Sequence, residues 1–248
     1  MTPLPSASFV GHRGTKIMNP LRSSDLDALV EACPLYPADL ALDLGCGRAE
    51  LLLRLVARWG NAALGVDRSR EWLEVARAEA VARLPHGDVQ WVQDDIHEAM
   101  KEAWLDPLGL AACVGATHAL GGPLPTTRRL RRHVRPGGFV VVGDGVWTAP
   151  PSEGALAGLG VAPTDYLTAE AWLAAAESEG LSPVHFVLSD RDAVDGYERR
   201  YVENLRQSQA AGETVAGAVE RIAWHDNFWP EINISLGFFT VAFRVGSA

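Results

Sequence analysis

The chain has 248 residues and a formal net charge of −9; 48 % of its residues are apolar and 21 % are charged. This balance is typical of a folded globular protein and excludes a disordered chain. The acidic surplus disfavours a nucleic-acid substrate, because phosphate groups are repelled by an acidic surface. We expect no transmembrane helix, because the sequence has no run of about 18 apolar residues. Residues 1–18 also lack the basic and apolar regions of a signal peptide.

The cysteine and histidine content argues against a disulfide framework and against a metal site. The three cysteines are odd in number and no pair has the C-x-x-C spacing. The seven histidines show no i, i+4 pairing, and residues 113–117 contain no acid. We therefore predict that the protein binds no metal and works in the reducing cytoplasm. The sequence does not indicate an oligomeric state.

The first half of the chain alternates short apolar runs with helical patterns. Residues 1–22 are rich in Pro, Ser and Gly and are predicted to be irregular, and a helix is expected to begin at residues 24–25. Alternating strand and helix patterns predict a parallel sheet with helices on both faces. The expected strands cover 40–43, 62–66, 89–92, 110–114 and 139–142, and helices carry the apolar residues within 51–59 and 72–80.

The second half differs in style after the break at Pro150-Pro151. Two amphipathic helices are expected, one carrying Tyr197 and Tyr201 and the next covering 215–222. The aromatic-rich stretch 224–229 is expected near a loop. The remaining predicted elements are a helix over 167–180 and strands over 184–188 and 235–245.

The strongest functional signal is the segment 43–47, Asp-Leu-Gly-Cys-Gly, which ends the first strand and opens a helix. Glycines allow a ligand to approach the backbone closely, and a helix N-terminus presents free N–H groups to an anionic group. A dinucleotide-binding loop would carry a third glycine where this chain has Glu50. A carboxylate there is a poor neighbour for a pyrophosphate, so this alternative is weakened but stays open.

An acid two residues before the first glycine suits S-adenosylmethionine, which carries an ammonium, a carboxylate, a ribose and an adenine. Asp43 is placed to take the ammonium, and Asp67, at the end of the second strand, is placed for the ribose hydroxyls. Residues 94–96, Asp-Asp-Ile, follow the third strand, where a carboxylate can accept from the adenine amino group and Ile96 can cover the ring. These acids share one rim of a parallel sheet, so a single site is expected there. Cys46 is interpreted as a small backbone-contact residue rather than a nucleophile.

These residues resemble the class I S-adenosylmethionine-dependent methyltransferases. The motifs that carry the resemblance are 42–47, 65–67, 93–96 and 130–138. The chain is also similar to bacterial small-molecule methyltransferases of the YjhP-like kind, through residues 18–21, 111–117 and 190–198.

The resemblance implies a Rossmann-like α/β fold whose mostly parallel sheet has seven strands, with an antiparallel last strand and helices on both faces. We expect one domain over 1–248, made of an N-terminal cap over 1–35, a cofactor-binding core over 36–145, a substrate-side elaboration over 146–230 and a last strand over 231–248. The cofactor is expected to be S-adenosyl-L-methionine, which leaves as S-adenosyl-L-homocysteine. The predicted cofactor-binding residues are Asp43, Gly45, Cys46, Gly47, Asp67, Arg68, Asp94, Asp95, Ile96 and Gly115.

On the acceptor side, His118 and Asp144 are the candidate catalytic residues. In this family the loop after the fourth strand lies beside the methyl group, and histidine titrates near neutral pH, as a general base should. Asp144 ends the fifth strand and is a candidate base or ligand for a substrate amine. For both residues a structural hydrogen bond is the alternative role. The predicted substrate-binding residues are Trp147, Tyr197, Tyr201 and Trp224, for which core packing is the alternative.

The predicted reaction is metal-independent methyl transfer by in-line displacement to an O, N, S or C atom of a small molecule. The expected partner is this small-molecule acceptor, with neither nucleic acid nor membrane. Two alternatives stay open at this point. One is an NAD-dependent oxidoreductase on the same kind of sheet, and the other is a non-catalytic S-adenosylmethionine-binding protein.

Overall fold

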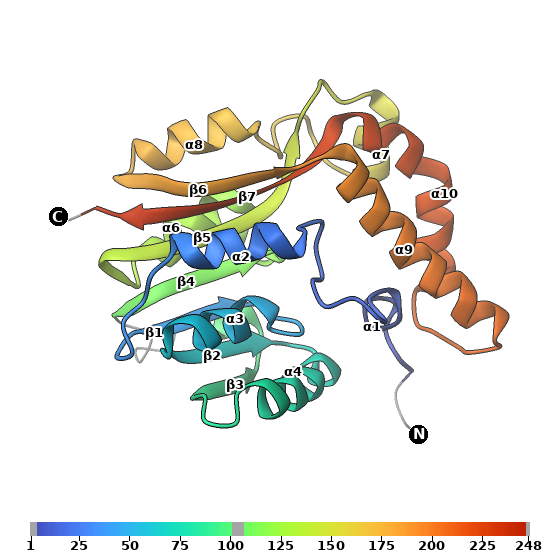
Figure 1. Ribbon diagram of the computed structural model, residues 1–248. Helices are drawn as coiled ribbons and strands as arrows, with labels where there is room; N and C mark the ends of the chain where they lie inside the picture. The colour runs from blue at the N-terminus through green and yellow to red at the C-terminus, as the bar shows by residue number, and fades with distance from the viewer. Residues whose placement is uncertain (1–3, 101–106, 247–248) are drawn as a thin grey trace.

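The centre of the computed structural model, which describes residues 4–100 and 107–246, is a seven-stranded sheet (Figure 1). The strand order is β3-β2-β1-β4-β5-β7-β6, and β7 runs antiparallel to both of its neighbours while the pairs from β3 to β5 are parallel. The predicted fold class is thereby confirmed, including the antiparallel last strand. The strands are β1 (Leu40–Leu44), β2 (Ala62–Asp67), β3 (Val89–Gln93), β4 (Leu108–Val114), β5 (Val134–Trp147), β6 (Leu181–Ser189) and β7 (Leu236–Val245).

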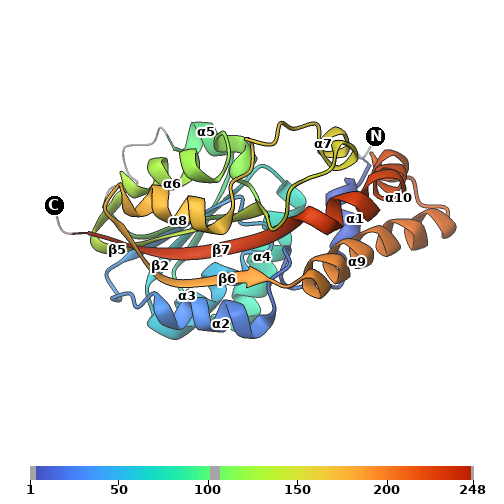
Figure 2. The ribbon, with the colours of Figure 1, turned by 90° about the horizontal axis from the view of Figure 1, so that it is seen from above.

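Helices cover both faces of this sheet (Figure 2). One face packs against α2 (Ser23–Ala32), α3 (Glu50–Trp59) and α4 (Arg70–Arg83), and the other against α5 (Ile96–Ala99), α6 (Pro123–Arg131) and α8 (Ala169–Glu177). Successive strand side chains point to opposite faces, so Ala41 joins one core cluster and Leu42 the other. Both are fully buried, which explains why β1 reads as a nearly continuous apolar run.

A helical arm stands beyond the carboxyl ends of the parallel strands (Figure 1). It consists of α9 (Arg191–Ala210) and α10 (Ala218–Ser235), with α7 (Glu153–Leu159) packed on α10 and α1 (Ala7–Gly11) packed on α9. Gly11 allows this close approach, because a Cβ there would lie 2.5 Å from the Tyr201 ring. The Asn204 amide donates to the carbonyls of Gly11 and Arg13, both at 2.9 Å. The N-terminal helix is therefore attached to the arm rather than to the sheet.

Two predictions of local structure were wrong. Residues 1–22 are not wholly irregular, because α1 begins after Ser6, whose hydroxyl accepts from the Phe9 N–H at 3.1 Å. The stretch 224–229 lies inside α10 rather than near a loop. This helix continues past Pro230, and the buried Trp229 and Ile232 hold it against the core. The division of the chain at residues 35, 145 and 230 remains a prediction.

Within the residues that the structure describes, no helix has the length and apolar character needed to cross a membrane.

Candidate active site

A cavity of about 490 Å³ lies at the carboxyl ends of β1 to β4, between the strand-end loops, the N-terminal segment and α9. It brings together all ten predicted cofactor-binding residues and two of the residues predicted for the acceptor side. Those that line it are Asp43, Gly45, Cys46, Gly47, Asp67, Arg68, Asp94, Asp95, Ile96, Gly115, His118 and Tyr197.

The conformation of the glycine loop after β1, residues 45–47, is fixed by hydrogen bonds from its backbone N–H groups to β2. Gly45 and Gly47 have φ of +71° and +53°, conformations that favour glycine. The N–H groups of Gly45 and Cys46 both donate to the Val66 carbonyl, at 2.8 and 3.0 Å. The Gly47 N–H donates to Oδ2 of Asp67 at 2.9 Å. These three amides are therefore bound within the protein and do not form a cradle for phosphate oxygens.

Asp67 of β2 holds the glycine loop together with Val66 of the same strand. Besides Gly47, it accepts from the Ser69 N–H, which lies 2.8 Å from Oδ1. An ionised carboxylate has roughly four acceptor positions, so each oxygen keeps capacity for a further donor. Asp67 lines the cavity, and that remaining capacity is available to a ligand with hydroxyl groups.

Asp43 is a buried carboxyl group in the cavity wall, with 6 % of its surface exposed. Burial raises its pKa to about 7, and the nearby carboxylate of Asp67 adds to the rise. Because the charged form of Asp43 lacks solvation, a cation beside it would be strongly favoured. The same surroundings raise the pKa of the Cys46 thiol, chiefly through burial and then through Asp43 and Asp67. A buried thiol with a raised pKa is a poor nucleophile, which agrees with a packing role for Cys46.

The segment after β3 supplies the wall next to the glycine loop. Asp95 caps α5, with its Oδ1 accepting from the His97 N–H at 2.8 Å, and Asp94 accepts from the Asp95 N–H at 2.8 Å. Ile96 is buried and its Cδ1 would lie 3.5 Å from a Cβ placed on Gly45. A flat apolar ligand group could therefore pack on Ile96 while polar atoms of Asp94 and Asp95 stay close to it.

Glu50 stands at the first residue of α3 and is neutralised by two arginines. Its carboxylate accepts from Nε of Arg54 at 2.8 Å and from Nη1 of Arg83 at 2.6 Å. Burial tends to raise the pKa of Glu50, but the two arginines outweigh it and the pKa is lowered. An ionised carboxylate therefore occupies the position where a dinucleotide loop would need a glycine.

The two candidate catalytic residues lie in different surroundings. His118 is exposed in the 3₁₀ turn η2 (Thr117–Leu120) and lines the cavity. Asp144 is not among the lining residues; it accepts from the Thr117 hydroxyl and from the Gly145 N–H, the latter at 2.7 Å. Burial raises the pKa of Asp144. Its contacts suit an anchor for the turn that carries His118, and the catalytic roles of both residues remain predictions.

Of the four aromatic residues predicted to bind substrate, only Tyr197 lines the cavity. The Trp147 Nε1–H donates to the Pro163 carbonyl at 2.8 Å and its indole borders a separate hollow. Tyr201 packs under α1, and the Trp224 Nε1–H donates to the Gly158 carbonyl at 2.6 Å within the arm. Their substrate-binding role remains a prediction, but these contacts fit the alternative of packing.

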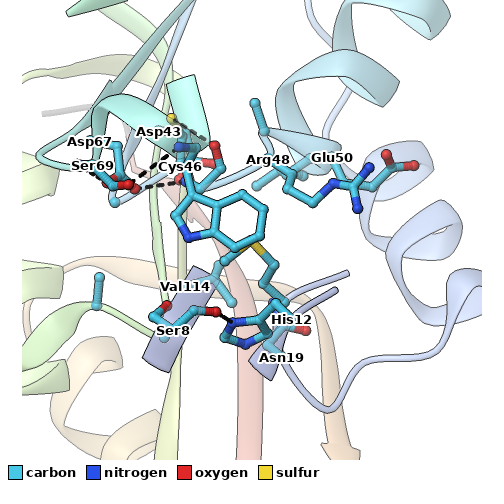
Figure 3. Close-up of a pocket in the computed structure, with 18 of the residues that line it drawn as sticks. Ser8, His12, Asn19, Asp43, Cys46, Arg48, Glu50, Asp67, Ser69 and Val114 are labelled. Carbon is cyan, nitrogen blue, oxygen red and sulfur yellow. Dashed lines mark hydrogen bonds between the residues drawn. The ribbon is translucent and has the colours of Figure 1, made fainter. Parts of the chain in front are cut away.

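Several lining residues were not predicted. His12 and Lys16 lie in the N-terminal segment, which shows no periodic pattern that would mark them. Trp72 is a buried residue of α4 within the apolar pattern 72–80, and it also borders the cavity. Figure 3 shows Ser8, His12 and Asn19 on the side of the cavity that faces Asp43 and Asp67.

Comparisons with known proteins point to one chemistry. A family model described as a methyltransferase domain matches residues 41–138. YjhP of Escherichia coli, described as uncharacterized, is 27 % identical over 222 residues, which is 86 % of this chain and 88 % of YjhP. A SAM-dependent methyltransferase from Geobacter sulfurreducens, solved with S-adenosyl-L-homocysteine, is 28 % identical with a TM-score of 0.83 and covers 99 % of this chain and 100 % of its own. Trans-aconitate 2-methyltransferase of an Azoarcus species is 34 % identical over 117 residues, 46 % of this chain and 42 % of that enzyme.

The raised pKa of Asp43 predicts a pH-dependent stability that an asparagine would remove. The unfolded carboxyl ionises near its ordinary pKa of 3.8, whereas the folded one keeps its proton up to about 7. The stability that the protonated Asp43 side chain contributes is fully present below the unfolded pKa of 3.8, and it is lost as the pH rises through the folded pKa of about 7. We expect Asp43→Asn to gain stability relative to the wild type between about pH 4 and pH 8, on the order of 2–4 kcal/mol. Urea unfolding of both proteins across this pH range measures the gain. A constant difference in the free energy of unfolding between wild type and variant at every pH would contradict the prediction.

A side chain at Gly45 should destabilise the protein through a steric clash, and a comparison with Gly60 separates this clash from backbone strain. A Cβ on Gly45 would lie 2.5 Å from the Ala116 Cβ, whereas a Cβ on Gly60, at a similar φ of +69°, meets open space. Gly60→Ala should cost about 1 kcal/mol of unfolding free energy through backbone strain, and Gly45→Ala about 1–3 kcal/mol more. The double variant Gly45→Ala with Ala116→Gly should recover the excess. If Gly45→Ala and Gly60→Ala lose the same unfolding free energy, the prediction is contradicted, because the clash with Ala116 would then cost nothing.

Proposed function

Because the chain belongs to the class I S-adenosylmethionine-dependent methyltransferases, we propose that it transfers a methyl group to an O, N, S or C atom of a small molecule. The observation that carries this proposal is the convergence of the glycine loop, Asp67 and residues 94–96 in one cavity at the strand ends. The Geobacter relative was solved with the demethylated product of this cofactor. The small-molecule acceptor is supported by the partial likeness to an enzyme named for trans-aconitate.

The residues present fit the chemical groups of S-adenosylmethionine. Asp67 binds the ribose hydroxyls through the acceptor capacity that Gly47 and Ser69 leave free. Asp43 faces the ammonium, whose positive charge favours the ionised carboxylate. Ile96 covers the adenine ring, and Asp94 and Asp95 accept from its amino group.

The same geometry is a poor match to a dinucleotide. A pyrophosphate needs free backbone N–H groups at the glycine loop, and those of Gly45, Cys46 and Gly47 are already bound within the protein. Glu50 adds an ionised carboxylate at the helix start. These contacts support S-adenosylmethionine over NAD as the cofactor.

In the proposed reaction the protein aligns the acceptor with the methyl group and receives a proton where one is released. The cofactor supplies the electrophilic methyl group, so positioning provides much of the rate enhancement. The acceptor lies on the side of the cavity bordered by His118, Tyr197 and the N-terminal segment. The proposed transfer needs no metal ion. Among the residues that the structure describes, no three His, Cys, Asp or Glu side chains are grouped as metal ligands.

Asp67→Ala should weaken binding of S-adenosyl-L-homocysteine by roughly tenfold to a hundredfold, because hydrogen bonds to a charged group contribute about 1.5–3 kcal/mol each. Calorimetric titration of wild type and variant measures the loss. The matched control is Asp88→Ala, an exposed aspartate outside the cavity, whose affinity should equal that of the wild type. Binding of NAD without S-adenosyl-L-homocysteine would contradict the proposal.

A screen for S-adenosyl-L-homocysteine release with carboxylic acids, phenols, amines and thiols then tests methyl transfer itself. Product formation with at least one acceptor is the expected result. Tight cofactor binding without turnover on any acceptor class would favour the non-catalytic binding protein instead.

A further inference from the structure

A hydrogen-bonded pair, the buried His12 and the half-buried Tyr197, borders the acceptor side of the cavity. Nδ1 of His12 lies 2.8 Å from the Ser8 carbonyl oxygen. A carbonyl only accepts, so Nδ1 carries the hydrogen. Nε2 lies 2.8 Å from the Tyr197 hydroxyl. In the neutral ring Nε2 is therefore the acceptor and the tyrosine hydroxyl is the donor.

The surroundings keep this pair neutral. Burial lowers the pKa of His12; the hydrogen bond to the Ser8 carbonyl opposes this in part, and the positive charge of Arg221 adds a smaller lowering. Arg221 comes from α10 and forms an ion pair with Glu198 of α9. Burial also raises the pKa of Tyr197, so its hydroxyl keeps its proton. His12 is thus an uncharged base with its acceptor nitrogen directed at a hydroxyl.

Contacts of the pair with neighbouring residues link it to the cofactor loop. The Tyr197 hydroxyl lies 3.3 Å from the Met18 carbonyl, and Sδ of Met18 would lie 2.8 Å from a Cβ placed on Gly47. One residue therefore separates the pair from the glycine loop. On the other side, the His12 ring meets the Trp72 indole edge to face, with ring centroids 6.1 Å apart. Both rings of the pair line the cavity, and Figure 3 shows His12 across it from Asp43 and Asp67.

Resting on the proposed function, we propose that His12, through Tyr197, accepts the proton of a protic acceptor: a hydroxyl, a thiol or an N–H group. A lone pair of the acceptor atom forms the new bond to the methyl carbon, and the electron pair of the methyl–sulfur bond stays on sulfur. The acceptor's proton passes to the Tyr197 oxygen as the tyrosine proton passes to Nε2 of His12. His12 then holds the proton as an imidazolium until it is released to solvent.

The two histidines of the cavity differ in how well they suit this role. His12 has 7 % of its surface exposed and its tautomer is fixed by the Ser8 carbonyl. His118 is exposed, and nothing in residues 4–100 or 107–246 hydrogen-bonds to its ring. A base with a fixed acceptor nitrogen needs no reorientation before it takes a proton. This favours His12 over His118, the residue that the sequence suggested.

Trp72 provides independent evidence that a polar atom of a ligand binds beside His12 and Tyr197. Its side chain is 5 % exposed and lines the cavity, yet its Nε1–H has no hydrogen-bond partner within the described part of the chain. A buried donor without a partner costs free energy that a ligand acceptor atom would recover. A protic acceptor has such an atom.

The first test requires no acceptor. Long-range proton–nitrogen NMR spectra of protein with ¹⁵N-labelled histidine, saturated with S-adenosyl-L-homocysteine near pH 7, report which ring nitrogen is protonated. The His12 signals are those lost in His12→Gln. We expect Nδ1 protonated and Nε2 bare. A protonated Nε2 would overturn the proposal, because that nitrogen could not receive a proton.

The second test uses an acceptor that turns over in the screen. Gln can keep a hydrogen-bond acceptor near Tyr197 but cannot take a proton, so His12→Gln should lower kcat by about 100-fold or more, as removal of a general base does. Tyr197→Phe should do the same, and KM and the affinity for S-adenosyl-L-homocysteine should change little in both. The matched controls are His86→Gln and Tyr36→Phe, which lie outside the cavity and should keep the wild-type kcat.

The pH profile separates proton acceptance from a structural role. Wild-type kcat should fall as the pH drops through the lowered pKa of His12, and this limb should be missing in His12→Gln, whose residual rate should rise with hydroxide concentration. An unchanged kcat in His12→Gln, or a loss confined to KM, would overturn the proposal. Failure of the proposed function is recognised separately, because it would appear as absent S-adenosyl-L-homocysteine binding or absent turnover in the wild type.

Discussion

The carboxylate of Asp67 is the contact on which the geometry of the site depends. It ends β2 and accepts from Gly47 in the loop after β1 and from Ser69 before α4. Two neighbouring strand ends and the helices that follow them are thereby fixed relative to one another. Because parallel strands bring their carboxyl ends to one edge, this carboxylate accepts hydrogen bonds from two loops and also lines the cavity, where the proposed function makes it a ligand for the ribose.

The other half of the cavity is built from segments far apart in the chain. The N-terminal helix is attached to the arm through Asn204 and Gly11, while the chain that follows it returns to the core, where Nη1 of Arg48 donates to the Thr15 carbonyl at 2.6 Å. Residues 12–19 therefore span the distance between arm and core, and His12 and residues 16–19 border the cavity. This arrangement places His12 and Met18 opposite the glycine loop, so acceptor and cofactor would meet between two separately supported walls.

The sequence was sufficient to predict most of the fold and to name ten candidate cofactor-binding residues that the structure brings together in one cavity. Apolar runs such as 62–66 form buried strands, and the predicted cofactor-binding residues lie at or shortly after the carboxyl ends of strands. A local sequence pattern therefore also indicates where these residues lie in the fold. The acceptor side was harder to predict because it depends on tertiary contacts. His12 lies in a segment without periodicity and acquires its role only by meeting Tyr197, which is 185 residues away. The Trp224 indole looked like a pocket residue but is engaged within the arm, since long-range packing decides which aromatic residues reach a cavity.

A crystal structure of the protein with S-adenosyl-L-homocysteine tests the central claim most directly. The account predicts the ribose hydroxyls within hydrogen-bond distance of Asp67, the amino acid end beside Asp43 and the adenine against Ile96, with the sulfur facing the side of the cavity that carries His12 and Tyr197. Density for the ligand outside this cavity, or with Asp67 in contact with Gly47 and Ser69 alone, would contradict it.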